Sequence, residues 1–404
     1  MNTCIYEKNG INTDYDKDIV YDRVLEGNKD SYTLGRMIGS GAEGCVYEVQ
    51  DMPEFAVKVF HDNRMANPVI RKKKEEKISF MVNQHVDIAG DNGGICLTWP
   101  FDTVYMNGDF KGYVMPRIHG GNKLCSITEK LRKNPENPVF TWKELAGIAQ
   151  RLASTVNRIH SFGYVIGDMN PENILIDREG VVTITDTDSF EIIDLHKNAY
   201  YPCMGGVPEM LPPELQNKNG ADYVPCFDKE SDDFALAVHI FMLLMNGNHP
   251  YEFSDADGNS SIAEHIAECK YYFGKINSHK IHFPENTQDY SIVPSYIRNL
   301  FKRAFCDMNK GYAARPSAAE WASKCSRLYS EKYKICHANK KHVFRADYGK
   351  CPWCDGQSMF ERDILVIARR IDNFLYSLRG DSVYGDFQWA VKGGIKDQNI
   401  DLFR

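Results

Sequence analysis

The sequence predicts an α+β fold with two lobes: a small antiparallel β lobe that carries one helix, and a larger, mainly helical lobe. Strand-like apolar runs dominate residues 32–118, whereas helical periodicity dominates the chain after Gly121. A cluster of cysteines and histidines near the C-terminus predicts a small knot and a further helix. The expected units are an N-terminal arm (residues 1–30), a small lobe (31–118), a large lobe (119–330), a Cys/His knot (331–357) and a C-terminal helix and tail (358–404).

The composition is that of an ordinary globular protein, with 43% hydrophobic and 25% charged residues among 404. A net charge of −7 argues against nucleic acid as a main partner, because phosphate binding requires a basic surface. The N-terminus lacks the basic start and apolar run of a secretory signal, and the longest apolar stretch, residues 234–245, is shorter than the roughly 20 residues of a membrane helix. We therefore expect a cytoplasmic protein that does not bind membranes and whose scattered cysteines are reduced.

The small lobe begins with a glycine-rich hairpin tip that contains Gly39, Ser40, Gly41 and Gly44. Backbone N–H groups of such a tip can approach phosphates, because glycine has no Cβ in the way. A simple tight turn and a dinucleotide-binding loop are the alternatives. The chain after Gly44 continues as a strand containing Val46 instead of opening a helix, which argues against the dinucleotide loop.

Lys58 lies on the next apolar strand, fourteen residues after the last loop glycine. A strand lysine can simply extend its head into solvent, but behind a glycine loop it is a candidate for binding the α- and β-phosphates. It then needs a carboxylate to orient it. The charged helical segment over residues 70–83 offers Glu75, on the apolar face of the predicted helix, with Glu76 as the rival. The basic run at residues 71–74 is expected to be a solvated face of this helix.

The large lobe carries a polar stretch bounded by short strands. Asp168 can accept a hydroxyl proton. Asn173 and Asp186 offer hard oxygen ligands for Mg²⁺, and Asp188 is a further carboxylate near such a metal. A polar turn between two strands is the alternative. The helices of this lobe are expected over residues 140–161, 231–246, 260–271, 294–306 and 317–332.

In their order and spacing these motifs resemble the eukaryotic-type protein kinases over residues 32–330. The catalytic-loop asparagine and the magnesium-binding aspartate of that family are thirteen residues apart, as Asn173 and Asp186 are here. The resemblance implies a protein-kinase-like fold that binds ATP and Mg²⁺. Further positions that match family motifs are Asp232, which tethers the catalytic loop, Arg315 and Glu214, which form an ion pair, and Met115, the gatekeeper.

The resemblance also implies the activity, which is transfer of a phosphoryl group to serine or threonine hydroxyls of a protein substrate or of the chain itself. Tyrosine is not indicated, because Glu172 stands where tyrosine kinases carry an arginine. The residues implied for catalysis are Asp168, Lys58, Glu75 and Asn170; those for the nucleotide are Gly39, Ser40, Gly41, Gly44, Val46, Ala56, Lys58, Met115, Arg117, Ile118 and Asn122; those for Mg²⁺ are Asn173, Asp186 and Asp188.

Several departures from the family pattern bear on activity. Gly167 replaces the arginine before the catalytic aspartate, so the chain is of the non-RD type and switching by loop phosphorylation is not expected. Asn170 replaces a lysine, Asp188 a glycine and Val207 a threonine. The alternative to an active kinase is a pseudokinase-like nucleotide-binding scaffold that recruits partners through the knot and the C-terminal helix, and transfer of AMP is a second rival.

The Asp186-Thr187-Asp188 sequence and the later knot resemble a bacterial subgroup of eukaryotic-like serine/threonine kinases. This narrower resemblance implies a place in a tellurite-resistance-associated phosphorylation triad. Its other members would be a partner phosphatase and a von Willebrand A-type protein.

The C-terminal knot has the spacing of a zinc site. Cys351 and Cys354 form a CxxC pair, and Cys336 with His342 supplies a second half-site upstream. His337 is the rival ligand, although its position next to Cys336 disfavours it. A redox CxxC pair is the other alternative, but no βαβ context surrounds it. Four ligands would make a closed structural Zn²⁺ site that folds the knot.

Overall fold

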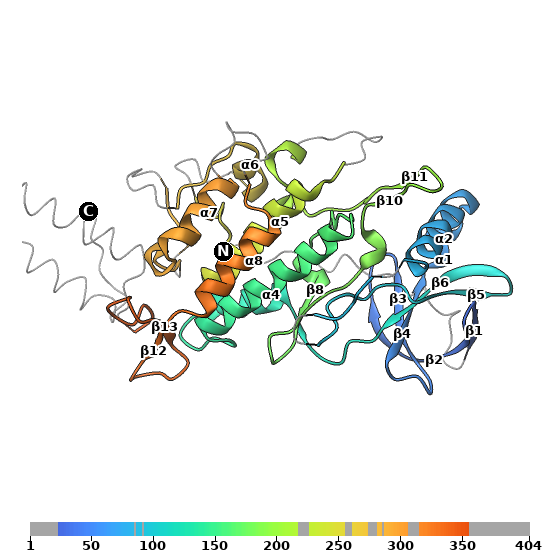
Figure 1. The fold of residues 1–404 in the computed structure, drawn as a ribbon, viewed down its shortest axis with the longest axis horizontal. Helices are drawn as coiled ribbons and strands as arrows, with labels where there is room; N and C mark the ends of the chain where they lie inside the picture. Colours follow the sequence, from blue (N-terminus) through green and yellow to red (C-terminus); the bar gives the residue numbers. More distant parts are fainter. Residues whose placement is uncertain are drawn as a thin grey trace, which may run out of the picture.

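The computed structural model describes residues 23–84, 86–90, 93–216, 226–254, 261–273, 281–284, 287–305 and 315–354. These residues form a β-rich lobe at one end of the molecule and a helical lobe in its middle (Figure 1). The predicted two-lobed α+β fold is confirmed. The predicted C-terminal helix and tail (358–404) and most of the predicted N-terminal arm lie outside the described residues.

The small lobe is a closed antiparallel barrel with the strand order β1-β2-β3-β4-β6-β5. The sequence predicts residues 1–30 to be an N-terminal arm, but residues 24–27 of it form strand β1, which closes the barrel by pairing with β5. The reason lies in Asp102, a buried carboxylate that accepts the backbone N–H groups of Asn28 and Lys29. The strands are β1 (Val24–Gly27), β2 (Ser31–Ser40), β3 (Gly44–Val49), β4 (Phe55–Phe60), β5 (Asp102–Met106) and β6 (Asp109–Pro116).

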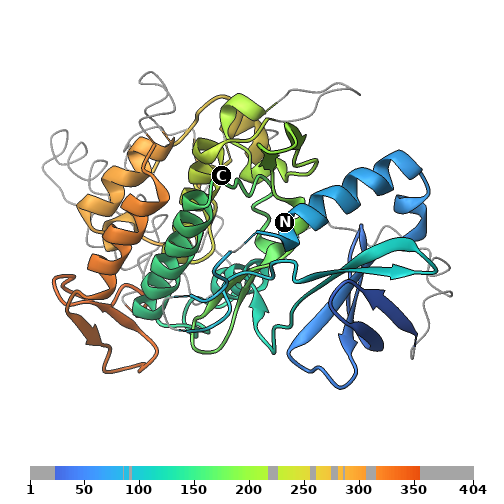
Figure 2. The same cartoon turned by 45° about the vertical axis from the view of Figure 1, so that its right-hand side comes forward.

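Helix α2 (Pro68–Val82) lies across the barrel (Figure 2), preceded by the short α1 (Asp62–Met65). Pro68 fits its first turn, and the Asn67 side chain caps it by accepting the N–H groups of Val69 and Ile70. Its buried face includes Ile78 and Met81, which pack in the main core.

The large lobe is built around α4 (Trp142–Ser161) and α5 (Lys229–Leu244). A capping box between Thr141 and Glu144 begins α4, and nearly every residue of α5 is buried. Helix α8 (Ala318–Tyr329) lies alongside α4 (Figure 1). The remaining helices are α3 (Leu124–Lys133), α6 (Ile262–Ala267) and α7 (Ser295–Phe305).

Short strands and turns of the large lobe carry the polar stretch. The strands β7 (Asn122–Lys123), β8 (Ile174–Ile176) and β9 (Val182–Ile184) form one small sheet, and β10 (Ile192–Asp194) pairs with β11 (Ala199–Tyr201). The intervening 3-10 turns are η1 (Pro171–Asn173), η2 (Thr187–Ser189), η3 (Pro208–Met210) and η4 (Pro213–Leu215), with η5 (Tyr290–Ile292) further along.

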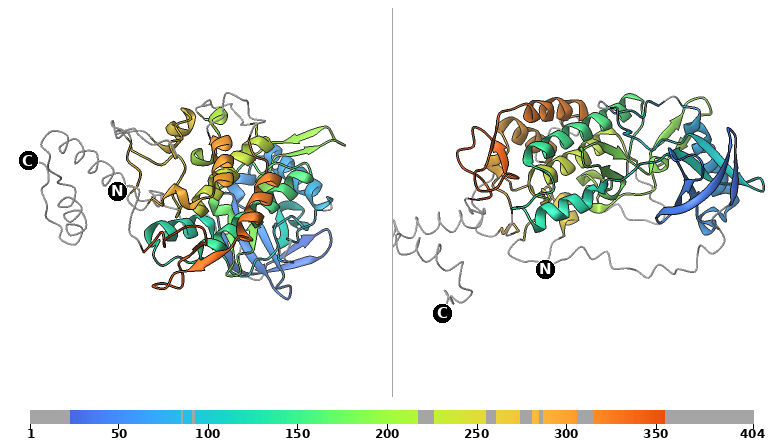
Figure 3. Two further views of the ribbon diagram at one scale, coloured as in Figure 1. Left: turned by 60° about the vertical axis from the view of Figure 1, so that its left-hand side comes forward. Right: turned by 90° about the horizontal axis from the view of Figure 1, so that it is seen from below.

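The Cys/His knot contains β12 (Tyr333–Ile335) and β13 (Val343–Arg345), which form a hairpin. It lies at the opposite end of the molecule from the barrel (Figure 3). Within the described residues, no helix has the length and apolar character needed to cross a bilayer.

Candidate active site

Lys58 is held by two aspartates that come from the far side of the lobe junction. Its Nζ donates hydrogen bonds to Asp186 and, at 2.7 Å, to Oδ1 of Asp188. Burial by itself would lower the pKa of Lys58, but the negative charges of Asp188 and Asp186 outweigh it and raise the pKa above its ordinary value. Lys58 is therefore a fixed ammonium group that joins the two lobes.

The two aspartates are placed by a tight turn after β9. Asp186 adopts the left-handed conformation (φ 58°), and η2 follows directly. The Thr187 hydroxyl donates to the carbonyl of Thr98 at 3.0 Å, which fixes this turn against the small-lobe side. As a result Asp186 stays partly accessible, whereas the side chain of Asp188 is fully buried.

Asp188 has more partners than its sequence position suggested. Its Oδ1 also accepts the Tyr113 hydroxyl at 2.7 Å, and its Oδ2 forms an ion pair with Lys74 at 2.9 Å. Burial would raise the pKa of Asp188, but Lys58 and Lys74 hold it well below the ordinary range. Both oxygens thus face protein groups, which favours Asn173 and Asp186 over Asp188 among the three predicted Mg²⁺ ligands.

The structure gives Lys58 other partners than the glutamate that was expected on helix α2. Glu75 accepts a hydrogen bond from the Tyr105 hydroxyl at 3.0 Å, and neither Glu75 nor Glu76 pairs with Lys58. Helix α2 is rotated so that Lys74 points toward Asp188. The basic run that was expected to be solvated therefore supplies Lys74 to the site, and Asp188, in the place of the family glycine, is the sequence signal for this second anion.

The catalytic loop is fixed by Asp232, as the sequence predicts. The carboxylate of this residue on α5 accepts the N–H groups of Ile166 at 2.8 Å and Gly167 at 2.9 Å, and His160 lies 2.9 Å away. These contacts set the backbone directly before Asp168. Burial first, and then the charge of Asp186, raises the pKa of Asp168 to about 6.

Asn170 and Asn173 lie on the same loop. The Asn170 side-chain oxygen accepts the N–H of Glu172 at 2.9 Å and so caps η1. The carbonyl of Asn173 accepts the N–H of Thr185 at 2.8 Å, which ties the loop to the segment that ends at Asp186. Two of the expected Mg²⁺ ligands, Asn173 and Asp186, thus lie on backbone segments that are hydrogen-bonded to each other.

The barrel presents a single face to the lobe junction. Because paired residues share a face, the register of Val46 with Lys58, Lys58 with Tyr113 and Ala56 with Met115 puts all five side chains on it. The expected nucleotide residues Val46, Ala56 and Met115 therefore share one face of the barrel with Lys58.

The glycine loop joins β2 to β3. Around Gly39 and Gly41 a Cβ would have space, whereas at Gly44 it would come within 2.2 Å of the Val59 carbonyl. Gly44 is therefore required by strand packing. Of the other expected nucleotide residues, Arg117 bonds to Glu48 at 2.7 Å, Ser40 ends β2, Asn122 begins β7, and Ile118 lies between β6 and β7.

The large lobe is closed by the expected ion pair. Arg315 and Glu214 form two parallel hydrogen bonds of 2.5 and 2.8 Å. Arg315 is buried, so this pair holds the end of the segment after Asp186 against the helical core.

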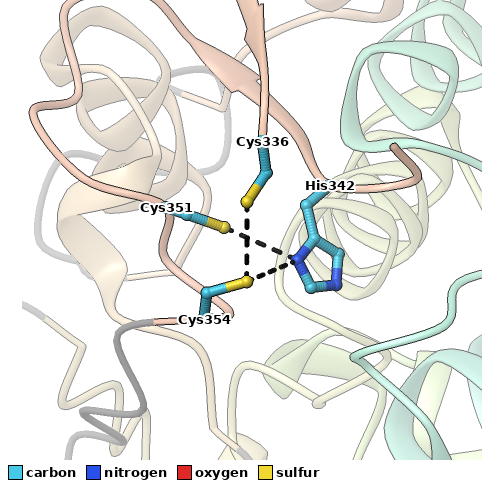
Figure 4. Close-up of side chains that lie close together, drawn as sticks. All are labelled: Cys336, His342, Cys351 and Cys354. Atoms are coloured by element: carbon cyan, nitrogen blue, oxygen red, sulfur yellow. Dashed lines mark hydrogen bonds between the residues drawn. The ribbon is translucent and has the colours of Figure 1, made fainter. Parts of the chain in front are cut away.

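The four predicted zinc ligands meet in one cluster (Figure 4). The ligand atoms of Cys336, His342, Cys351 and Cys354 all lie within 4.8 Å of one another. His342 directs Nδ1 at the thiols of Cys354 and Cys351, at 3.3 and 3.5 Å, and its Nε2 lies 2.6 Å from the Glu136 carbonyl. His337 is outside the cluster. Three thiols and an imidazole oriented by a carbonyl are a donor set that fits tetrahedral Zn²⁺.

Comparison with known proteins gives one family, since the family model described as protein kinase domain matches residues 32–325. Protein kinase YegI of Escherichia coli strain K12 is 28% identical over 342 residues, covering 82% of this chain and 50% of its own length. Human ribosomal protein S6 kinase alpha-2 is 27% identical over 235 residues, 55% of this chain and 28% of its own. The chain thus spans about half the length of the first of these relatives.

Among solved structures, the Toxoplasma gondii specific rhoptry antigen kinase domain overlays on 76% of this chain and 86% of its own, with a TM-score of 0.49 and 14% identity.

Proposed function

Since this chain belongs to the protein kinase family, we propose that it transfers the γ-phosphoryl group of ATP to serine or threonine hydroxyls of a protein substrate or of itself. The observation that carries the proposal is the meeting of Lys58, Asp186 and Asp168, which come from three separate stretches of the chain. One oxygen of Asp168, Oδ1, is buried without a hydrogen-bond partner among the described residues, as a group that awaits a hydroxyl would be.

Each residue then has a distinct task. Lys58 binds the α- and β-phosphates, and the barrel face around Val46, Ala56 and Met115 receives the base. Asp168 accepts the hydroxyl proton as the oxygen attacks. Asp186 and Asn173 would hold Mg²⁺, which neutralises phosphate charge when bound. Asn170 contributes a hydrogen bond where the family has a cation, so we expect a slow enzyme.

The test uses ATP labelled at the γ or the α position. Wild-type protein is expected to transfer γ label to itself or a generic protein acceptor, and acid hydrolysis should yield phosphoserine or phosphothreonine. Asp168→Asn should lower the rate at least about 10³-fold, because it removes the proton acceptor. Equal rates in wild type and this variant would favour the nucleotide-binding scaffold, and transfer of α label would show AMP transfer instead.

We also propose that the Cys/His cluster binds a structural Zn²⁺. The finer placement in a bacterial phosphorylation triad, with a partner phosphatase and a von Willebrand A-type protein, stays a prediction from the family resemblance, as do the cytoplasmic location and the absence of nucleic-acid and membrane partners. A bacterial relative such as YegI is compatible with this placement.

A further inference from the structure

Asp188 is a buried carboxylate at the position where the kinase family has a glycine. This carboxylate is fully buried, yet it lies between two ammonium groups that come from different elements. Lys58 extends from strand β4 and donates a hydrogen bond, Lys74 extends from helix α2 and forms an ion pair, and the Tyr113 hydroxyl from β6 donates a second hydrogen bond. A buried charge that is paired with two cations and accepts hydrogen bonds from Lys58 and Tyr113 holds its neighbours in one geometry.

Helix α2 supplies a cation to this cluster instead of an anion. Kinases orient the strand lysine with a glutamate on this helix, but here Glu75 bonds to Tyr105 and Lys74 takes the inward position. The heads of Lys58 and Lys74 both lie near the Phe60 ring, at 5.6 and 4.9 Å from its centroid. The two lysines therefore share one small space with Asp188.

We propose that Asp188 is the positioning residue that orients Lys58, and that Lys74 couples helix α2 to it, so that anion and cation have exchanged places relative to the family arrangement. The proposal rests on the proposed phosphotransfer function. In this arrangement the orienting carboxylate lies on the segment that also carries Asp186. Helix α2 supplies a lysine where the family has a glutamate.

The arrangement has a physical advantage for a lysine that touches two aspartates. Asp186 is a candidate Mg²⁺ ligand, and a metal ion competes with Lys58 for its oxygens. Asp188 has both oxygens inside the protein, so it keeps Lys58 in place while Asp186 is otherwise engaged.

Lys74 also reaches the glycine-rich loop. Its Nζ lies 2.8 Å from a carboxylate oxygen of Glu43, which follows Gly41 and Ala42 at the hairpin tip. One ammonium group thus joins helix α2, the loop and the Asp188 turn. A displacement of the helix would act on Lys58 through Lys74 and Asp188.

The first experiment moves the carboxylate from the turn to the helix. Asp188→Gly restores the family glycine and is expected to lower kcat by about 10²-fold, because Lys58 loses its orientation. Adding Lys74→Glu to that variant returns an anion to the same space and should recover kcat at least about tenfold. The matched control is Asp188→Gly with Lys74→Met, which removes the same cation but supplies no anion, and should not recover.

The second experiment compares two carboxylates by isosteric changes. Asp188→Asn is expected to lower kcat as strongly as Asp188→Gly, whereas Glu75→Gln, which alters only the bond from Tyr105, should leave kcat within about threefold. The affinity for ADP without Mg²⁺, measured by calorimetry, should follow the same order. The ADP affinity can be measured even if the protein transfers no phosphate, so this experiment tests the inference separately from the proposed function.

Each variant must melt within a few degrees of wild type. If Asp188→Gly does not fold, Asp188→Asn takes its place in the comparison. The inference is overturned if Asp188→Asn keeps wild-type kcat and ADP affinity, if Glu75→Gln loses as much as Asp188→Asn, or if the Lys74→Glu and Lys74→Met double variants behave alike. A wild-type protein that binds ADP through Asp188 but transfers no phosphate would instead overturn the proposed function.

Discussion

At the residue scale, the carboxyl group of Asp168 is the proton acceptor of the proposed reaction. It lies in a largely buried position near Asp186, and both the burial and the neighbouring negative charge favour its protonated form. Its pKa is raised to about 6, closer to neutral pH than an ordinary aspartate. A proton acceptor with such a pKa is stronger than a solvent-exposed carboxylate, provided that the pH is high enough to ionise it.

The pH dependence of the rate follows from this value. Only ionised Asp168 can accept the hydroxyl proton, so kcat/KM should be lost as the pH falls through about 6 and be constant above it. The measurement is kcat/KM between about pH 5 and pH 8, with saturating Mg²⁺ and the folded fraction checked at each pH. A flat profile over that range would contradict the assignment of Asp168.

At the element scale, the segment after Asp186 is docked by apolar packing. Cys203, Leu215 and Phe227 form a small buried cluster beside the catalytic loop. Gly167 has φ +70°, and a Cβ there would lie 2.8 Å from the Cys203 side chain. The glycine that stands in place of the family arginine is thus required by close packing against Cys203.

Replacement of Gly167 tests this packing. Gly167→Ala should destabilise the fold by the strain of a positive φ, about 1–2 kcal/mol, and by overpacking of about 1–3 kcal/mol in addition. Gly163→Ala is the matched control, because Gly163 has φ +86° with nothing within 4 Å of its Cβ position. The free energy of unfolding from urea titration measures both. Equal losses in the two variants would show that contact with Cys203 is unimportant.

At the scale of the whole molecule, the Cys/His knot and the β barrel lie at opposite ends (Figure 3). The cluster is joined to the helical lobe through His342, which contacts the Glu136 carbonyl, and through β13, which lies next to α4. Its metal should therefore stabilise the large lobe without reaching the nucleotide site.

Removal of the metal separates these two effects. Purified protein is expected to hold one Zn²⁺ after dialysis, and the double variant Cys351→Ser/Cys354→Ser to hold none and to melt at a lower temperature. Its affinity for ADP at a temperature where it is folded should match wild type. Cys125→Ser, at a cysteine outside the cluster, is the control. Full zinc content in the double variant would rule out the site.

Sequence by itself determined the residues whose spacing along the backbone is fixed by short local elements. Lys58, Asp168, Asn173 and Asp186 lie on strands and a tight loop that leave little choice of position, and the cysteine knot is equally local. The closed barrel was missed, because pairing of β1 with β5 joins segments distant in the chain.

Only the tertiary structure decided which groups share the buried space around Lys58. In the structure helix α2 directs Lys74 toward Asp188 and Glu75 toward Tyr105, and the turn after Asp186 places Asp188 between the two lysines. The sequence pattern favoured a glutamate of helix α2 as the partner of Lys58. A sequence shows which residues are charged, but not which charges are buried together. That choice depends on packing across the whole lobe junction.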